Sequence, residues 1–168
     1  VNVVGGSFDE NDATSSGGAI CVYPSTLELK DVVFNGNEAP YGGAVGNNGA
    51  TVNVTGSTQF KNNVASYRGG AIDITKSDDV TGRLTMTGGS FDGNSAPTGG
   101  AVYMRSGEAA FDGTAFNSNA STDANASNSR EIGGGAAYVH SGAKLTLTNA
   151  TLDSNTTKKY GGALQVNG

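Results

Sequence analysis

The chain has little cysteine, little histidine and no long apolar run, and each shortage excludes a class of protein. It holds one cysteine, Cys21, among 168 residues, so no disulfide can form within it. With His140 as the only histidine, a zinc site of the Cys/His type is excluded as well. No stretch of 18 or more apolar residues occurs, so we expect no membrane insertion by this segment.

Positive charge and large apolar side chains are also scarce. Ten Lys and Arg stand against 15 Asp and Glu, which argues against nucleic acid or an anionic membrane surface as a partner. Val, Leu, Ile and Phe together number 31, a share at which disorder is usually suspected. Disorder also requires high net charge and no periodicity. Here the net charge is −5 and the apolar residues recur in register, which favours a thin, repeated core.

What the chain does contain is one short pattern in six copies. Each copy places a large apolar residue three positions before an asparagine, and a Gly-Gly-Ala segment follows. The first halves are Phe8 with Asn11, Phe34 with Asn37, Phe60 with Asn63, Phe91 with Asn94, Phe116 with Asn119, and Leu152 with Asn155. The Gly-Gly-Ala segments begin at Gly17, Gly42, Gly69, Gly99, Gly134 and Gly161. A period of 25 to 36 residues indicates a solenoid with one coil per copy.

Two alternating segments in each copy predict strands. One precedes the phenylalanine, as in residues 27–29, and one follows Gly-Gly-Ala, as in residues 72–74. We therefore predict an all-β fold, a right-handed parallel β-helix of about six coils, with residues 1–168 as a single segment. Neither end shows a capping repeat, so we expect either an excerpt of a longer solenoid or a unit that stacks end to end.

The recurring residues have structural roles in this fold. We expect the phenylalanines to stack in the interior and the asparagines to form an inward ladder, with each amide bonded to the coils beside it. Asparagine also tolerates left-handed backbone angles, which suits a sharp corner. The glycine pairs should supply positive φ angles.

The paired motifs resemble the repeat of the polymorphic outer-membrane proteins of chlamydiae, in which Gly-Gly-Ala-Ile alternates with Phe-x-x-Asn. Ile20 and Ile72 complete the full form, and Val45, Val102, Ala137 and Leu164 are variants of it. The resemblance covers the whole chain. It implies a secreted β-helical passenger, extracellular or at the bacterial cell surface, with a role in adhesion or surface display.

Departures from the repeat are the places where function is expected. Two insertion loops, residues 75–83 and 120–133, lengthen their coils, and insertions in solenoids often carry binding. Loop growth without function is the alternative for both.

An outward face of the second strand is the other candidate binding site. By alternation it presents Asp73, Tyr103 and Tyr138, beside Arg105 and His140 in the next column. Exposed aromatic rings near hydrogen-bonding groups suit a sugar ring or a protein partner. Alternatively, the two tyrosines only stabilise the sheet as a cross-strand pair.

Catalysis is not expected, because glycoside hydrolysis needs two carboxylates and this face offers one, Asp73. Calcium is the one cofactor kept as a candidate, at the acidic clusters of residues 9–12 and 78–79. The members of these clusters are Asp9, Glu10, Asp12, Asp78 and Asp79.

Three functions follow, in order of preference. The first is non-catalytic recognition, in which the outer face and loops bind a glycan or protein on another cell. The second is a structural spacer or a filament subunit that associates end to end with copies of itself. The third is a polysaccharide lyase or hydrolase with part of its site outside this segment.

Overall fold

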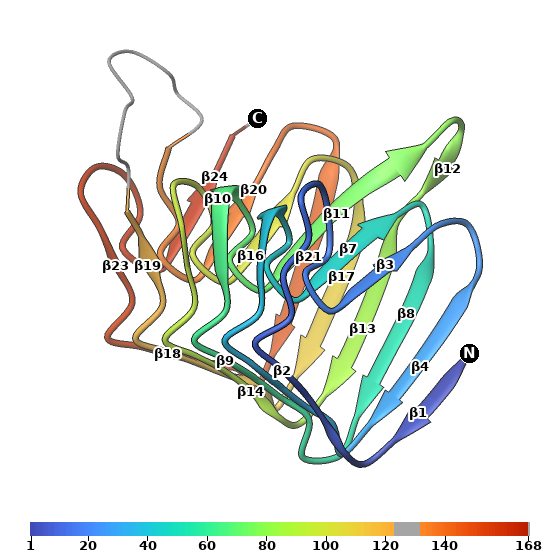
Figure 1. Ribbon diagram of the computed structural model, residues 1–168. Helices are drawn as coiled ribbons and strands as arrows, with labels where there is room; N and C mark the ends of the chain where they lie inside the picture. The colour runs from blue at the N-terminus through green and yellow to red at the C-terminus, as the bar shows by residue number, and fades with distance from the viewer. Residues whose placement is uncertain (123–131, 168) are drawn as a thin grey trace.

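The structure, a computed structural model, describes residues 1–122 and 132–167. Within them the chain forms a parallel β-solenoid of about six coils, as the repeat predicts. Figure 1 shows the coils side by side, so that equivalent strands line up as continuous sheets along the solenoid. No helix long and apolar enough to cross a membrane occurs among the described residues.

Four sheets run along the solenoid, and we name them A to D in the order in which a coil passes through them. Sheet A holds β1 (Asn2–Val4), β4 (Thr26–Lys30), β8 (Thr51–Thr55), β13 (Arg83–Thr87), β17 (Gly107–Asp112) and β21 (Ala143–Thr148). Sheet B holds β2 (Ser7–Asp9), β5 (Val33–Asn35), β9 (Gln59–Lys61), β14 (Ser90–Asp92), β18 (Ala115–Asn117) and β22 (Thr151–Asp153). Sheet A is the alternating strand predicted before each phenylalanine, and sheet B holds the phenylalanine position itself.

Sheet C lies between the asparagine and the glycine pair, where the sequence predicts no strand. It holds β6 (Glu38–Tyr41), β10 (Val64–Arg68), β15 (Ser95–Ala96), β19 (Ala120–Ser121) and β23 (Thr156–Thr157). Sheet D follows Gly-Gly-Ala and holds β3 (Ile20–Val22), β7 (Val45–Asn48), β11 (Ile72–Ser77), β16 (Val102–Met104), β20 (Ala137–Val139) and β24 (Leu164–Val166). The first insertion loop forms a hairpin, in which β12 (Val80–Thr81) pairs antiparallel with the end of β11.

The phenylalanine ladder is confirmed. Rings on successive coils stack nearly parallel, with centroids 4.9 Å apart between Phe8 and Phe34 and 4.8 Å apart between Phe91 and Phe116. This spacing is the distance between neighbouring strands, so stacking follows directly from the parallel register. The central rings are fully buried.

The asparagine ladder is also confirmed, and it satisfies buried backbone groups. The Asn63 amide donates from Nδ2 to Asn94 Oδ1 at 2.9 Å and to the Phe34 carbonyl at 3.1 Å. Its own Oδ1 accepts from both the backbone N–H and the Nδ2 of Asn37. The same pattern links the asparagines from Asn11 to Asn155. The four central amides, Asn37, Asn63, Asn94 and Asn119, are fully buried, and each bonds the asparagines of both neighbouring coils.

Two details of the corners differ from the prediction. The residue with a positive φ is the one before the ladder asparagine, such as Glu10 or Gly36, and not the asparagine itself. In the glycine pairs, only the first member has a positive φ. The second is required by close approach, because a Cβ on Gly43 would lie 2.2 Å from the Gly70 carbonyl oxygen of the next coil.

Candidate functional site

Two columns of side chains meet on the outside of the solenoid, on either side of the Gly-Gly-Ala segments. We call this region the outer corner. In register along the solenoid, one column holds Tyr41, Arg68, Thr98 and Gly133, and the other holds Gly46, Asp73, Tyr103 and Tyr138. Arg68 connects the two columns, because it bonds Asp73 and lies over the Tyr103 ring.

The outer corner is packed, and this corrects the expected exposed face. Tyr103 and Tyr138 retain 1% and 0% of their exposure and Asp73 retains 3%, although all three point away from the inner core. The two tyrosine rings stack at 5.2 Å, and Asn167 donates to the Tyr138 hydroxyl. The alternation correctly places these side chains outside the inner core. The alternation does not predict that neighbouring side chains of the outer corner cover them.

Arg68 lies at the centre of the outer corner and contacts residues of both columns. Its guanidinium lies 4.7 Å from the Tyr41 ring centroid and 4.8 Å from that of Tyr103. Its Nε donates to Asp73 Oδ1 at 3.1 Å. A delocalised cation between two aromatic faces is a favourable arrangement when it is partly desolvated.

The Asp73 carboxyl is electrostatically unusual. Burial raises its pKa to about 6, although Arg68 and, more weakly, Arg105 act in the opposite direction. The raised pKa reflects a charge held away from water with one direct cationic partner. A group so covered, with both oxygens near Arg68, is placed to support the fold and not to contact a ligand.

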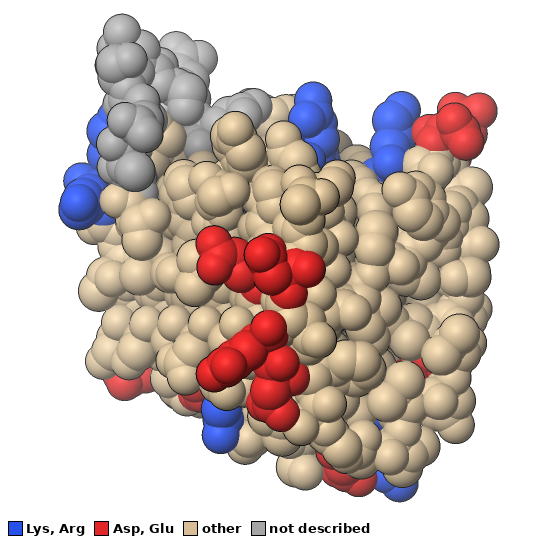
Figure 2. All heavy atoms as spheres, in the orientation of Figure 1, with Lys and Arg blue, Asp and Glu red and all other residues tan. Residues whose placement is uncertain are grey.

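A groove of about 490 Å³ opens beside the outer corner, where sheet D ends. Its lining side chains are Arg68, Thr75, Lys76, Arg105, Ser106, His140 and Ser141. We call it the cationic groove. Figure 2 shows basic side chains along the upper edge of the molecule, with an acidic group beside them at the upper right, and two further acidic groups on the surface that faces the viewer.

The predicted binding residues thus divide into two sets. Arg105 and His140 line the cationic groove, on adjacent coils: the Arg105 N–H donates to the Ile74 carbonyl and the His140 N–H to the Met104 carbonyl. Asp73, Tyr103 and Tyr138 do not line it.

Sequence reasoning missed three lining residues, Arg68, Ser106 and Ser141. The recurring five-residue spacing across Gly-Gly-Ala, with Arg68 opposite Asp73, is the signal that could have placed Arg68 at this site. Lys76 belongs to the first predicted insertion loop, whose hairpin brings it beside the groove.

Two features of the cationic groove leave it able to bind. Within the described residues, the salt bridges join Arg68 to Asp73 and Arg83 to Glu108, so neither Lys76 nor Arg105 forms one. The Ser106 hydroxyl oxygen is buried and has no hydrogen-bond partner in the described part of the chain. Buried polar groups are normally satisfied, so an unpaired hydroxyl at a groove needs an explanation.

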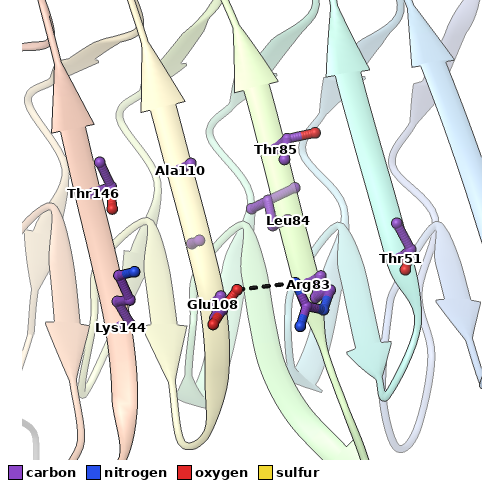
Figure 3. Close-up of a pocket in the computed structure, with 9 residues that line it drawn as sticks. Thr51, Arg83, Leu84, Thr85, Glu108, Ala110, Lys144 and Thr146 are labelled. Atoms are coloured by element: carbon purple, nitrogen blue, oxygen red, sulfur yellow. Dashed lines mark hydrogen bonds and ion pairs between the residues drawn. The ribbon is translucent and has the colours of Figure 1, made fainter.

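A second hollow, of about 410 Å³, lies on the outer face of sheet A. Figure 3 shows Arg83 and Glu108 pointing toward each other from β13 and β17, with Lys144 on the next strand. Arg83 Nη1 lies 3.0 Å from Glu108 Oε2, and both side chains are more than half exposed. Because these charges offset each other, this hollow is a weaker candidate than the cationic groove.

The acidic clusters predicted as calcium sites do not form a metal-binding group in residues 1–122 and 132–167. In these residues no three His, Cys, Asp or Glu side chains lie together as metal ligands. Asp78 and Asp79 lie at the turn of the β11–β12 hairpin and do not line the cationic groove. Of the second predicted insertion loop, residues 123–131 lie outside the described residues.

Comparison with known families identifies the repeat. Residues 5–23 and 57–75 match the model of the Chlamydia polymorphic membrane protein repeat, and each segment holds one Phe-x-x-Asn and one Gly-Gly-Ala. No curated protein and no solved structure matches the chain. The matched segments fold as equivalent parts of two coils, and the other copies stack on them in the same register. Two segments of the chain therefore match the Chlamydia polymorphic membrane protein repeat, and the chain folds as a parallel β-solenoid.

Proposed function

We propose that this chain is the surface-exposed, passenger-like β-solenoid of a bacterial protein, and that it binds a glycan or protein on another cell. The repeat family supports a surface location, since it is a family of membrane proteins. The observation that carries the binding role is the cationic groove, where Lys76 and Arg105 stand without salt bridges to the described residues beside an unpaired buried hydroxyl.

The mechanism is non-covalent recognition by a rigid surface. The Phe and Asn ladders fix each coil relative to the next, so Arg105 and His140 are held by backbone bonds at a strand spacing of about 4.8 Å. A preorganised surface loses less entropy on binding than a mobile one. Many copies on one cell would raise the overall affinity further.

Catalysis is not part of the proposal. Asp73, the one carboxyl that the sequence places on the outward face, is covered by the outer corner and bonded to Arg68. The spacer or filament role and the polysaccharide-degrading role stay predictions without a specific observation in their favour.

The test uses the purified chain with an N-terminal fluorescent label, measured for saturable binding to a panel of host and bacterial cells. We expect binding that Lys76→Gln with Arg105→Gln reduces at least tenfold. The matched control is Arg83→Gln with Lys144→Gln, which removes the same charge from sheet A and should bind as the original chain does. No binding to any cell, or equal loss in both double variants, would contradict the proposal.

A further inference from the structure

The cationic groove concentrates positive charge on a chain whose net charge is −5. Lys76, Arg105 and His140 come from the β11–β12 hairpin and from the ends of two neighbouring coils, while Arg68 reaches the groove from the outer corner. We infer that the cationic groove binds the sulfate or carboxylate groups of an acidic glycan. This names a ligand class for the binding proposed above, and it rests on that proposal.

The first argument is charge. Arg68 gives two of its N–H groups to Asp73, so its charge is largely offset. Arg105 is exposed and forms no salt bridge to a described residue, and its planar guanidinium can donate two parallel bonds to a carboxylate or sulfate. Lys76 adds a second exposed cation. The groove therefore presents two cations that an anionic ligand can neutralise.

The second argument is the pattern of hydroxyls. Thr75 Oγ1 already donates to Asn48 Oδ1, and Ser141 Oγ lies 3.1 Å from His140 Nδ1. Ser106 Oγ is buried among the described residues without any partner. This oxygen has almost no accessible surface, so a ligand oxygen supplies the missing bond by displacing a neighbouring side chain of the groove. Cations and hydroxyls side by side match a sugar that carries both hydroxyl and acidic groups.

The third argument is shape. The groove volume of about 490 Å³ lies within the usual range for sites that bind small ligands. Lys76, Arg105 and Ser141 are exposed, so the groove is open at its side and a polymer can lie in it without a free end entering. Arg105 and His140 follow each other along the solenoid axis, and a linear glycan lying along this axis would meet them in turn.

The decisive experiment measures binding of three size-matched oligosaccharides by isothermal titration calorimetry: one sulfated, one carrying only uronic carboxylates, and one neutral. We expect at least one acidic compound to bind and the neutral one not to bind. The double change of Lys76 and Arg105 to Gln should weaken binding at least tenfold, and the Arg83 and Lys144 control should not. The comparison between the two acidic compounds tells which anion is preferred.

Ser106→Ala tests the groove without a change of charge. Removing a hydroxyl that has no partner should leave the unfolding temperature unchanged or slightly higher, because no bond within the described protein is lost. If the hydroxyl donates to the ligand, affinity should fall about five- to tenfold. Unchanged affinity would remove Ser106 from the site.

The outcomes separate the ligand class from the broader proposal. Acidic compounds that fail to bind, or that bind both double variants equally, overturn the inference. If cell binding nevertheless depends on Lys76 and Arg105, surface recognition stands and the partner is a protein. If a single-stranded DNA of the same charge competes with the acidic oligosaccharide equally well, the groove recognises charge alone. This result would also overturn the assignment to a glycan.

Discussion

The inside of the solenoid and its outer corner are built on opposite principles. Inside, the same side chain recurs from coil to coil, with Leu152 the one exception in the phenylalanine ladder, so Phe stacks on Phe and Asn bonds Asn. In the outer corner, equivalent positions hold different residues, and the contacts join unlike side chains: Arg68 bonds Asp73 and lies over the rings of Tyr41 and Tyr103. The interior repeats because the backbone register repeats. The outer corner can vary from coil to coil because its contacts join unlike side chains. The cationic groove lies beside this variable region.

The largest effects should come from the interior. Phe91→Ala removes a ring stacked between Phe60 and Phe116 and in edge contact with Phe111. We expect the free energy of unfolding to fall by about 3–5 kcal/mol. Urea unfolding measures it, with Thr87→Ser, at the exposed end of β13, as the control expected within about 0.5 kcal/mol of the original chain. A loss below about 1 kcal/mol for Phe91→Ala would contradict an interior held by the ladder.

The glycine pairs mark the boundary between the interior and the outer corner. A Cβ on Gly43 would lie 2.2 Å from the Gly70 carbonyl oxygen and 2.5 Å from that of Val64, so Gly43→Ala should cost about 3 kcal/mol by forcing coils apart. Gly113→Ala is the contrast: its φ is +63°, but nothing lies within 4 Å, so only the left-handed strain of about 1 kcal/mol applies. Equal decreases in the unfolding temperature of the two variants would mean that the close contact between coils at Gly43 does not add to the cost of the substitution.

The charged pair is the part of the outer corner most sensitive to loss of one partner. Arg68→Ala leaves Asp73 buried without its bonded cation, and we expect a cost of about 2–3 kcal/mol at pH 7, since Arg68 is partly exposed. Adding Asp73→Asn should recover much of this loss, because no isolated charge then remains. A double variant no more stable than Arg68→Ala would show that the guanidinium acts by packing on Tyr41 and Tyr103 and not through its charge.

The smallest effect is a pH dependence with opposite signs at two aspartates. The folded-state pKa of Asp73 is raised to about 6 by burial, above its unfolded value of about 3.9. Its contribution to stability is therefore complete below about pH 4 and is lost as the pH rises through about 6. Asp31, in contrast, has its pKa lowered chiefly by the Ser57 backbone N–H, so its contribution is lost as the pH falls.

Urea unfolding between pH 4 and 7 separates the two. As the pH rises, the original chain should lose stability relative to the Asp73→Asn variant. Over the same range it should gain stability relative to the Asp31→Asn variant. A flat difference for Asp73→Asn would mean that the carboxyl has an ordinary environment.

The sequence predicts the interior well and the outer corner poorly, for a physical reason. Phe60 and Asn63 recur at fixed spacing because each contacts its own equivalent on the next coil, so a single-chain repeat reveals the contact. Tyr103 becomes buried through Arg68, a residue in a different part of the repeat on a neighbouring coil. Such contacts between unlike positions leave no periodic signal. Sheet C is missed for a related reason, since its strands are short and carry no clean alternation.

The most direct test of the account is a ¹H–¹⁵N NMR titration of the intact chain with an acidic oligosaccharide. If the cationic groove is the binding site, shift changes should concentrate at the amides of Thr75, Lys76, Arg105, Ser106 and Ser141, while Arg83 and Lys144 on sheet A stay unchanged. Changes centred on sheet A, or spread evenly over all basic residues, would contradict a specific site beside the outer corner.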